Sequence, residues 1–303
     1  MKNIFDPMTL NGLQLKNRLW RSATWLALAD DDGNLTQPLF DAYRELATGG
    51  VGAIITGITT ISPHDALLDG IVQFSSDRVL DQHKRFTRMI HEFDCKIFMQ
   101  TAIVNPGYER VDEVIPLFTD AAIRAKAAGY DGIQLHAAHG FFLSSFIEYD
   151  RGKILGDILD SIRAELGKDF PLIAKINGED CIEACQTMAS HGIDAIEISG
   201  DFTSRRSRAH NNEGYFKDYA VEVKRHVDVP IILVGGHRSI EEMNWTLNKT
   251  PIEFLSLSRA LVREPSLINR WKSGDIRPSA CVGCNACYRT PGHRCKFVMM
   301  GRG

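Results

Sequence analysis

The 303-residue chain lacks several features that would assign it to a particular class of protein. It has no apolar run of the roughly 20 residues that a membrane-spanning helix needs. Neither sign of charge dominates, because 35 Lys and Arg residues are balanced by 38 Asp and Glu residues. No local run of Lys and Arg makes up for this balance, so the chain has no long-range field for polyanions. We therefore expect it to bind neither nucleic acid nor a membrane.

The sequence also lacks a secretion signal and an internal linker. Its N-terminus has no apolar core of signal-peptide length and no small-residue cleavage site, so we expect a cytoplasmic protein. Hydrophobic residues make up 44% and charged residues 24%, which is typical of globular proteins. Only after Gly274 does the composition change, becoming rich in Cys, Gly and Arg. This predicts one domain over 1–274 and a short Cys-rich tail over 275–303.

Short apolar runs alternate with amphipathic segments along the chain. The apolar runs cover 19–25, 51–58, 95–102, 131–138, 171–177, 194–200, 230–236 and 253–259. Near-continuous apolarity is typical of parallel strands that are buried on both faces. Eight such strands with helices between them over roughly 250 residues predict a (β/α)8 TIM barrel. The competing open, doubly wound sheet usually carries G-x-G-x-x-G after an early strand, and this sequence has none.

In a barrel, functional groups lie at the C-terminal ends of the strands. Here these positions are polar and neutral to basic, and they lack the carboxylate pair of a glycosidase. Glycines after the seventh strand and Ser-Arg after the eighth indicate a phosphate site, because barrels often build one from these two loops. The candidates at all strand ends are Ser22, Ala23, Thr24, Gln100, His136, His139, Lys175, Gly235, Gly236, Ser258 and Arg259.

Gln100 and Lys175 are expected to face the barrel centre. The amide of Gln100 offers a donor and an acceptor, which suits an imide-like ring edge. The charge of Lys175 suits a ring that becomes anionic. Together with the phosphate site, this combination predicts flavin mononucleotide (FMN). Structural alternatives exist: Lys175 could form an ion pair with Glu197, Gln100 could be a filler, and Arg259 could be a surface charge.

Several motifs resemble those of the NADH:flavin oxidoreductase, or old yellow enzyme, family. The first is an N-terminal pattern formed by Phe5, Pro7, Leu10, Leu15, Lys16, Asn17 and Arg18. Further motifs are GGVGAIITG at 49–57, HAAHG at 136–140, VGG at 234–236 and SLSRALVREP at 256–265. The resemblance extends from about Ile4 to Cys295, and HAAHG is its most specific part.

The resemblance implies roles for the candidate residues. Backbone groups of Ser22, Ala23 and Thr24 would contact the flavin, and Gln100 would bind its pyrimidine edge. Lys175 stands where many members have Arg near flavin N1. The phosphate would be held by Gly235, Gly236, Ser258 and Arg259. His136 and His139 would donate hydrogen bonds to the carbonyl oxygen of the substrate.

The same resemblance implies the partners of the reaction. NAD(P)H would give a hydride to the flavin, which would pass it to an electron-poor alkene or a related small electrophile. The resemblance also allows a homo-oligomer, because related barrels often pair. Two further readings stay open. One is a flavin-binding barrel that has lost alkene reduction and acts as an electron carrier or redox sensor through its tail. The other is a flavin-free barrel for a sugar phosphate, which leaves Gln100, Lys175 and the two histidines unexplained.

The sequence departs from the family pattern around the expected substrate site. Phe141 occupies the position where members usually have a Tyr that protonates the substrate, so water or another side chain must act instead. Trp25 is bulkier than the residue found in many members and would narrow the substrate space. The loops after the third and fourth strands are short, and from Phe146 the chain is expected to run straight into a helix. Arg205, Arg206 and Arg208 could clamp an acidic group of the substrate, but a solvated loop is the commoner explanation for such a run and is the one preferred here.

The last four of the seven cysteines are closely spaced. Cys281, Cys284, Cys287 and Cys295 form the pattern C-x2-C-x2-C-x7-C, and such spacing within an intracellular chain suggests metal binding before disulfides. Large relatives, the dienoyl-CoA reductases and trimethylamine dehydrogenase, carry a [4Fe–4S] cluster on a similar tail. Four thiolates suit a cluster or Zn equally well, and reduced thiols are the third alternative. We expect no second flavin domain after the tail, so a cluster would need an external partner or would be a structural relic.

Overall fold

The computed structural model describes residues 1–65, 68–104, 111–200 and 213–301. Two sequence interpretations fall outside these residues. One concerns Arg205, Arg206 and Arg208, whose segment is not described. The other concerns the loop after the third barrel strand, at 105–110, so its predicted shortness stays a prediction.

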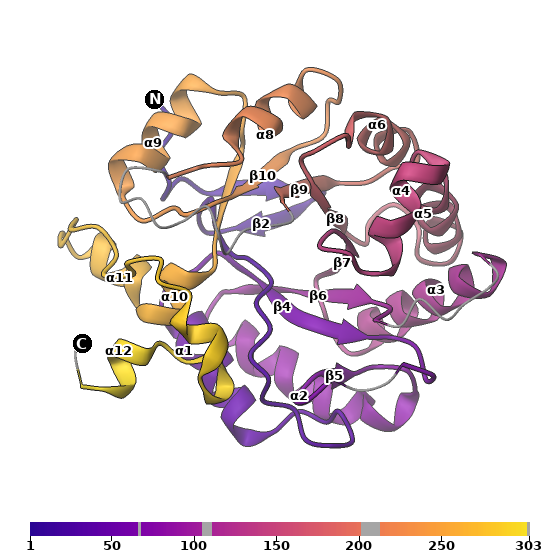
Figure 1. The fold of residues 1–303 in the computed structure, drawn as a ribbon, viewed down its shortest axis with the longest axis horizontal. Coiled ribbons are helices and arrows are strands. Elements are labelled where there is room, and N and C mark those ends of the chain that lie inside the picture. Colours follow the sequence, from indigo (N-terminus) through magenta and orange to yellow (C-terminus); the bar gives the residue numbers. More distant parts are fainter. Residues whose placement is uncertain (66–67, 105–110, 201–212, 302–303) are drawn as a thin grey trace.

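Eight parallel strands form a closed ring. The first of them, β3, pairs with β4 on one side and with the last strand, β11, on the other, which closes the barrel. Seven of the strands lie inside predicted apolar runs, and β4 overlaps its run at 51–58, so the predicted (β/α)8 barrel is confirmed (Figure 1). The strands are β3 (Leu19–Arg21), β4 (Ala53–Thr60), β6 (Lys96–Ala102), β7 (Gly132–Ala137), β8 (Leu172–Asn177), β9 (Ala195–Ser199), β10 (Ile231–Val234) and β11 (Phe254–Leu257).

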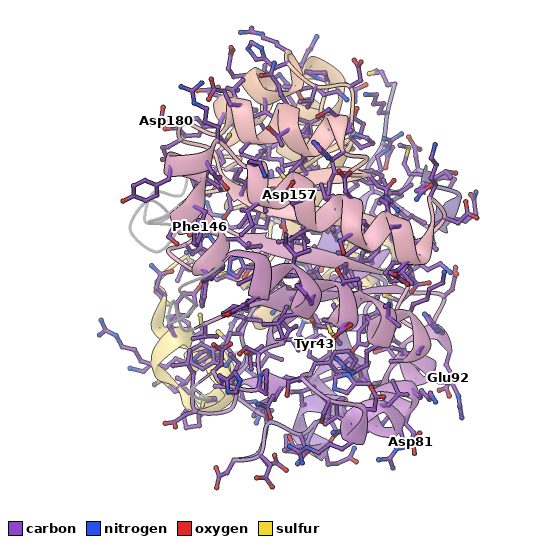
Figure 2. All side chains as sticks on the ribbon, turned by 90° about the vertical axis from the view of Figure 1, so that its right-hand side faces the viewer. Tyr43, Asp81, Glu92, Phe146, Asp157 and Asp180 are labelled. Carbon is purple, nitrogen blue, oxygen red and sulfur yellow. The ribbon has the colours of Figure 1, made fainter. Side chains whose placement is uncertain are left out.

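Amphipathic helices cover the outside of the ring. In α1 (Gln37–Thr48) the side chains of Leu39, Tyr43 and Leu46 share one face and are buried against the strands. Asp81 and Glu92 are labelled toward the edge of the molecule in Figure 2, whereas Tyr43 is buried. The remaining covering helices are α2 (Leu80–His91), α3 (Val111–Ala127), α5 (Lys153–Leu166), α6 (Ile182–Ser190), α8 (Lys217–Lys224), α9 (Ile240–Lys249), α10 (Arg259–Arg263) and α11 (Leu267–Lys272).

The N-terminal end of the barrel is filled with apolar side chains. Trp20 of β3 lies with its ring centroid 5.0 Å from that of Phe98 and 5.6 Å from that of Phe254. Leu10 and Leu15 join this cluster from a hairpin of β1 (Met8–Leu10) and β2 (Leu13–Leu15), which the sequence analysis did not predict. Because apolar side chains fill this end, the polar side chains inside the barrel lie toward the C-terminal end.

The chain after β7 differs from the prediction. A short helix, α4 (Phe142–Asp150), precedes α5, whereas the sequence had suggested a direct run into one helix from Phe146. Phe142 and Phe146 are one turn apart, and their ring centroids lie 4.8 Å apart. This contact gives α4 an apolar face, which explains why the segment is helical.

The C-terminal segment packs against the barrel. It contains the 3-10 turns η2 (Ala286–Arg289) and η3 (Pro291–His293) and a short helix, α12 (Lys296–Met299). It is drawn in yellow at the edge of the molecule in Figures 1 and 2. The division at 274 into domain and tail stays a prediction. Across the described residues, no helix is both long and apolar enough to cross a membrane.

Candidate functional site

Two adjoining cavities lie at the C-terminal ends of the strands. The larger has a volume of about 1410 Å³ and the smaller a volume of about 100 Å³. Ala23, His139, Lys175, Ser258 and Tyr288 line both, so the two cavities form one site. The predicted residues that line one or both are Ser22, Ala23, Thr24, Gln100, His136, His139, Lys175, Gly236, Ser258 and Arg259.

Among the residues predicted at the strand ends, Gly235 alone is not in the described linings of these two cavities. Its carbonyl oxygen accepts hydrogen bonds from Gly214 N at 2.6 Å and from Tyr215 N at 3.3 Å. Its φ of +144° is a conformation that side chains rarely adopt. Gly235 therefore shapes the turn before the smaller cavity, while Gly236 lines that cavity.

A buried hydrogen-bond network crosses the barrel beneath the larger cavity. Gln100 donates from Nε2 to Oε1 of Gln134 at 2.8 Å, and Gln134 donates from Nε2 to Oε2 of Glu197 at 2.8 Å. Gln100 and Gln134 are register partners on β6 and β7. These bonds orient the amide of Gln100.

Lys175 and Glu197 form a buried ion pair at the centre of this network. They are register partners on β8 and β9, and Lys175 Nζ lies 3.2 Å from Glu197 Oε2. Lys175 also donates to Ser22 Oγ at 2.9 Å. Glu197 Oε1 accepts from Ser22 Oγ at 2.7 Å and from Ser256 Oγ at 2.6 Å. The structural pairing considered for Lys175 is therefore present, and Lys175 lines both cavities as well.

The surroundings of Glu197 keep its carboxylate ionised. Burial by itself raises the pKa of this group, but the charge of Lys175 and the hydrogen bonds from Ser256, Ser22 and Gln134 outweigh it. The pKa of Glu197 therefore falls below its ordinary value. The result is an ionised carboxylate that lies 3.2 Å from the Lys175 amine under the cavity.

His136, on β7, is buried beside two other rings. Its ring centroid lies 5.3 Å from that of His139 and 4.6 Å from that of Phe141. Its Nδ1 atom is buried and has no hydrogen-bond partner among the described residues. Burial and the nearby His139 and Lys175 lower the pKa of His136 well below its ordinary value. His136 is therefore a neutral imidazole, which can donate one hydrogen bond and accept another.

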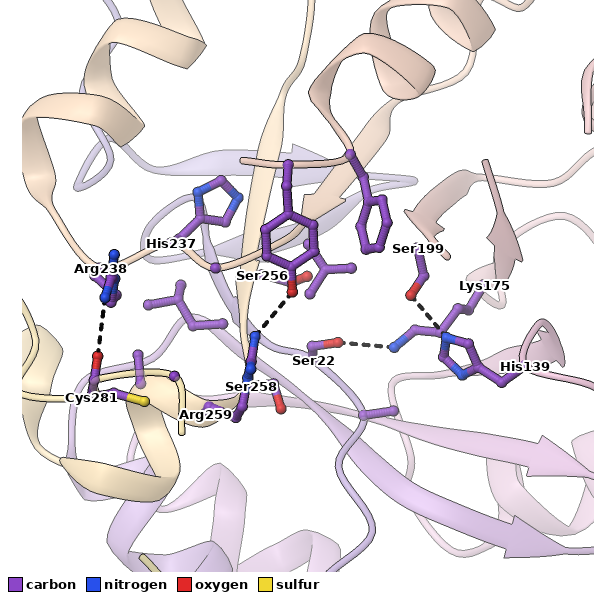
Figure 3. Close-up of a pocket in the computed structure, with 18 of the residues that line it drawn as sticks. Ser22, His139, Lys175, Ser199, His237, Arg238, Ser256, Ser258, Arg259 and Cys281 are labelled. Carbon is purple, nitrogen blue, oxygen red and sulfur yellow. Dashed lines mark hydrogen bonds between the residues drawn. The ribbon is translucent and has the colours of Figure 1, made fainter. Parts of the chain in front are cut away.

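His139 lies just after β7 in a strained backbone conformation. Its φ is +63°, in the left-handed region that non-glycine residues seldom occupy. Its backbone N donates to Asn177 Oδ1 at 3.3 Å, and its Nε2 lies 3.0 Å from Ser199 Oγ (Figure 3). The two contacts fix the imidazole at the border between the cavities. Strained residues held this firmly cluster at functional sites.

Arg259 begins α10 at the edge of the smaller cavity. Its guanidinium donates to Tyr215 Oη at 3.0 Å and to Asn285 Oδ1 at 2.6 Å. Arg238, beside Gly236, donates to the carbonyl oxygen of Cys281 at 3.4 Å (Figure 3). Both cations line the small cavity, so an anion of phosphate size would meet two guanidinium groups there.

The C-terminal segment forms part of the wall of the larger cavity, which the sequence analysis missed. His293 Nδ1 lies 2.6 Å from the carbonyl oxygen of Trp25, and the two rings meet edge-on with centroids 5.1 Å apart. Trp25 lines the cavity, as predicted from its position. The lining residues from the segment itself are Cys284, Asn285, Ala286, Tyr288, Arg289, Thr290, Lys296, Met299 and Met300.

The four clustered cysteines line one small cavity of about 20 Å³. No group of three or more His, Cys, Asp or Glu side chains that could hold a metal occurs in the described part of the chain, so the predicted metal site at Cys281, Cys284, Cys287 and Cys295 is not supported. Burial raises the pKa of Cys281 and of Cys287, which favours thiols over the thiolates that metals need. All seven cysteines are outside disulfide bonds.

Comparison with known proteins places this geometry in context. The sequence profile of the NADH:flavin oxidoreductase / NADH oxidase family matches residues 3–109 and 107–277. The chain belongs to this family. Family membership agrees with the barrel and with a site for a flavin at its C-terminal end, as the resemblance implied.

The chain spans about half the length of two of its curated relatives. It is 24% identical to an NADH oxidase of Thermoanaerobacter brockii, over 93% of this chain and 53% of that protein. It is 25% identical to a metal reductase of Desulforamulus reducens, over 94% of this chain and 51% of that protein. It matches an NADPH dehydrogenase of Clostridium acetobutylicum at 24% identity, over 88% of this chain and 93% of that protein.

Solved structures share the fold. A 2-naphthoyl-CoA reductase in complex with 2-naphthoyl-CoA superposes with a TM-score of 0.85 at 19% identity, covering 94% of this chain and 54% of that one. An old yellow enzyme homologue from Zymomonas mobilis gives a TM-score of 0.76 at 17% identity, covering 93% of this chain and 96% of that one. At this identity the similarity establishes the barrel architecture.

Proposed function

We propose that this family member binds FMN, takes a hydride from NAD(P)H and reduces an activated, enone-like alkene or a related small electrophile. The observation that carries the proposal is the single continuous site. It joins an oriented amide (Gln100), a buried cation (Lys175) and two adjacent imidazoles (His136 and His139) to a small cavity with arginines at its edge. An NADPH dehydrogenase among the relatives supports the same activity.

The residues present fit FMN. Neither cavity has an Asp or Glu among its described lining residues, so nothing there repels a phosphate dianion. Gly236 has a φ of +74° and no side chain to obstruct a phosphate, and Arg259 supplies a guanidinium beside it. We propose that Gly235, Gly236, Ser258 and Arg259 hold the phosphate, with Gly235 acting through the turn that it forms. When bound, FMN would supply the hydride acceptor and donor of the reaction.

The network below the cavity would orient the residues that meet the flavin ring. We propose that Gln100 binds the pyrimidine edge, because its amide is fixed by Gln134. Lys175 is held beside Ser22 and Glu197, so its charge stays in place to stabilise negative charge on the ring. Backbone groups of Ser22, Ala23 and Thr24 would contact the ring from the end of β3.

The two histidines would bind the oxygen of the substrate. A neutral His136 can donate an N–H hydrogen bond without adding a positive charge to the site, and His139 is fixed next to it. Hydrogen bonds from both would strengthen as negative charge develops on the substrate oxygen, which is the role of an oxyanion hole. Phe141 cannot donate a proton, so the proton for the α-carbon would come from water or another side chain.

The test is the absorbance spectrum of protein purified without oxygen, followed by turnover of cyclohexenone with NAD(P)H. We expect bands near about 370 and 450 nm from bound flavin, and alkene-dependent oxidation of NAD(P)H. A colourless protein that takes up no added FMN would refute the proposal and leave the sugar-phosphate barrel. Bound flavin without turnover on a broad alkene panel would refute the alkene reductase alone.

The second candidate is an electron carrier or redox sensor that acts through the C-terminal cysteines. The observation that favours it is the placement of the four thiols around one cavity. Cys281 also lines the smaller cavity of the candidate site, and Cys284 lines the larger one. This candidate predicts bound flavin, no alkene turnover and loss of titratable thiols on mild oxidation. A broad absorbance shoulder that disappears in air would assign an iron–sulfur cluster to these cysteines, although the thiols as described do not form a metal site.

A further inference from the structure

Two cations of the C-terminal segment line the larger cavity without compensating charges. Arg289 and Lys296 both belong to the lining, and both side chains are exposed. Neither forms a salt bridge with any residue that the structure describes, although many other cations of the chain do. Lys175, the third Lys or Arg in this lining, already has an ionic partner in Glu197 at 3.2 Å.

The charge of the cavity wall is therefore one-sided. Its described lining residues include Lys175, Arg289 and Lys296 but no Asp or Glu. Glu197 is paired with Lys175, so the positive charges of Arg289 and Lys296 have no acidic counterpart among the described lining residues. A concave surface of one sign concentrates ligands of the opposite sign. The chain as a whole has a net charge of −3, so this positive region is a local feature and not a property of the entire surface.

The segment that carries the two cations is fastened to the barrel on both sides of them. Before Arg289, Asn285 accepts a hydrogen bond from Arg259 at 2.6 Å. Between the two cations, His293 lies 2.6 Å from the Trp25 carbonyl oxygen. After Lys296, the ring of Phe297 lies 5.6 Å from the guanidinium carbon of Arg263. These contacts hold both cations at the cavity wall.

We propose that Arg289 and Lys296 bind an anionic group, a carboxylate or a phosphate, of the molecule that occupies the larger cavity. The inference rests on the proposed function and narrows its substrate class. Apolar side chains of Trp25, Phe141 and Met299 line the same cavity, so the ligand combines an apolar electrophilic part with the anionic group. Such an anionic group belongs either to the electrophile or to the phosphates of NAD(P)H.

The experiment compares two electrophiles that share the same enone, one of which carries an added carboxylate. Benzylideneacetone and its para-carboxylate have the same enone, and the holoenzyme is assayed with each at low ionic strength. We expect kcat/KM to be about tenfold higher for the carboxylate, through a lower KM. In the R289Q/K296Q double variant, the ratio of the two kcat/KM values should fall to within about twofold of one, because the KM of the carboxylate rises. Added salt should weaken the preference of the unmodified protein in the same way.

The matched control is Arg294→Gln. Arg294 is an exposed cation of the same segment, but it is not among the described residues that line the cavity. This variant should keep the full preference. The KM values of NADPH and NADH, measured in parallel, identify the source of the anion. If the double variant raises only these KM values and not that of the carboxylate, the two cations bind the hydride donor. Two results would overturn the inference. One is that the unmodified protein shows no preference for the carboxylate and that the double variant keeps the KM values for NADPH and NADH. The other is that R294Q loses the preference as fully as the double variant does.

Failure of the proposed function would be distinguishable from failure of this inference. If neither enone is reduced, the proposed activity fails, but binding can still be measured by calorimetry with the saturated ketones benzylacetone and its para-carboxylate. Tighter binding of the carboxylate that is lost in R289Q/K296Q and kept in R294Q supports the inference without turnover. Equal binding of the two ketones overturns it for the electrophile.

Discussion

Lys175 Nζ and Glu197 Oε2 lie 3.2 Å apart, and their side chains are only 4% and 0% exposed. Taking one partner from a buried pair leaves an uncompensated charge in a low-dielectric interior, at a cost of about 3–5 kcal/mol. The pair therefore links the stability of the barrel to its proposed chemistry, because the same lysine lines both cavities.

Replacing Lys175 by Met should lower the free energy of unfolding by about 3–5 kcal/mol at pH 7, since Glu197 stays buried without its cation. The K175M/E197Q double variant should recover much of this loss. Urea unfolding of the two single variants and the double variant measures the coupling. Additive losses would show that the two side chains do not stabilise each other.

Phe141→Tyr should raise turnover of an alkene substrate. The ring of Phe141 lies 4.6 Å from that of His136 and lines the larger cavity, so a hydroxyl there would supply the missing proton donor. A positioned general acid contributes about 10²- to 10⁴-fold, and we expect a gain of at least about tenfold in kcat with cyclohexenone. Phe141→Leu is the control. An equal gain in this variant would mean relief of crowding, and no gain with Tyr would mean that water suffices as the donor.

Arg259→Gln should weaken FMN binding by about 10- to 100-fold, because hydrogen bonds to charged groups contribute about 1.5–3 kcal/mol. Riboflavin has the same ring but no phosphate, so its affinity should change by less than about twofold. Titration of the flavin-free protein with both ligands, followed by flavin fluorescence, makes the comparison. An equal loss of riboflavin affinity would show that the substitution disturbs the structure around Tyr215 and Asn285, which Arg259 contacts, and does not remove a phosphate contact.

His83 should make the protein less stable as the pH falls. Burial lowers the pKa of His83 to about 3, and its Nδ1 lies 2.7 Å from Tyr130 Oη. In the unfolded chain the pKa returns to about 6.5, so the unfolded state gains a proton first, and stability is lost as the pH drops from about 6.5 toward 3. Between pH 7 and 5, His83 should account for about 2 kcal/mol of this loss.

Urea unfolding at pH 7 and pH 5 would test this contribution. The His83→Gln variant should lose about 2 kcal/mol less than the unmodified protein over this interval. His64 is exposed, so His64→Gln should keep the pH dependence of the unmodified protein. Identical pH dependence in the unmodified protein and His83→Gln would show that His83 keeps its ordinary pKa in the fold.

The barrel was predictable because parallel strands that are buried on both faces form near-continuous apolar runs in the sequence. The run at 171–177, for example, contains β8 entirely. The hairpin of β1 and β2 forms no such run, because each strand has only three residues and buries a single leucine. The short helix α4 depends on contacts such as that between Phe142 and Phe146, which a search for full amphipathic helices overlooks.

Most of the candidate site was predictable from strand ends and motifs, but its supporting network was not. Gln134 and Ser199 were missed, although each lies two positions from a polar residue on the same strand, as in Gln134–His136 and Glu197–Ser199. Side chains two apart in a strand share a face, so paired polar residues within an apolar run could have indicated a polar barrel interior. Tyr215 could not be found this way, because its contact with Arg259 spans 44 positions of sequence.

The contact between His293 and the Trp25 carbonyl oxygen joins residues 268 positions apart. It makes docking of the C-terminal segment and occupation of the cavity two linked equilibria, since Trp25 takes part in both. Such coupling is reciprocal: the factor by which a ligand strengthens docking of the segment equals the factor by which docking strengthens binding of the ligand. Resistance of the segment to a protease would then report on occupancy of a cavity that the protease never enters.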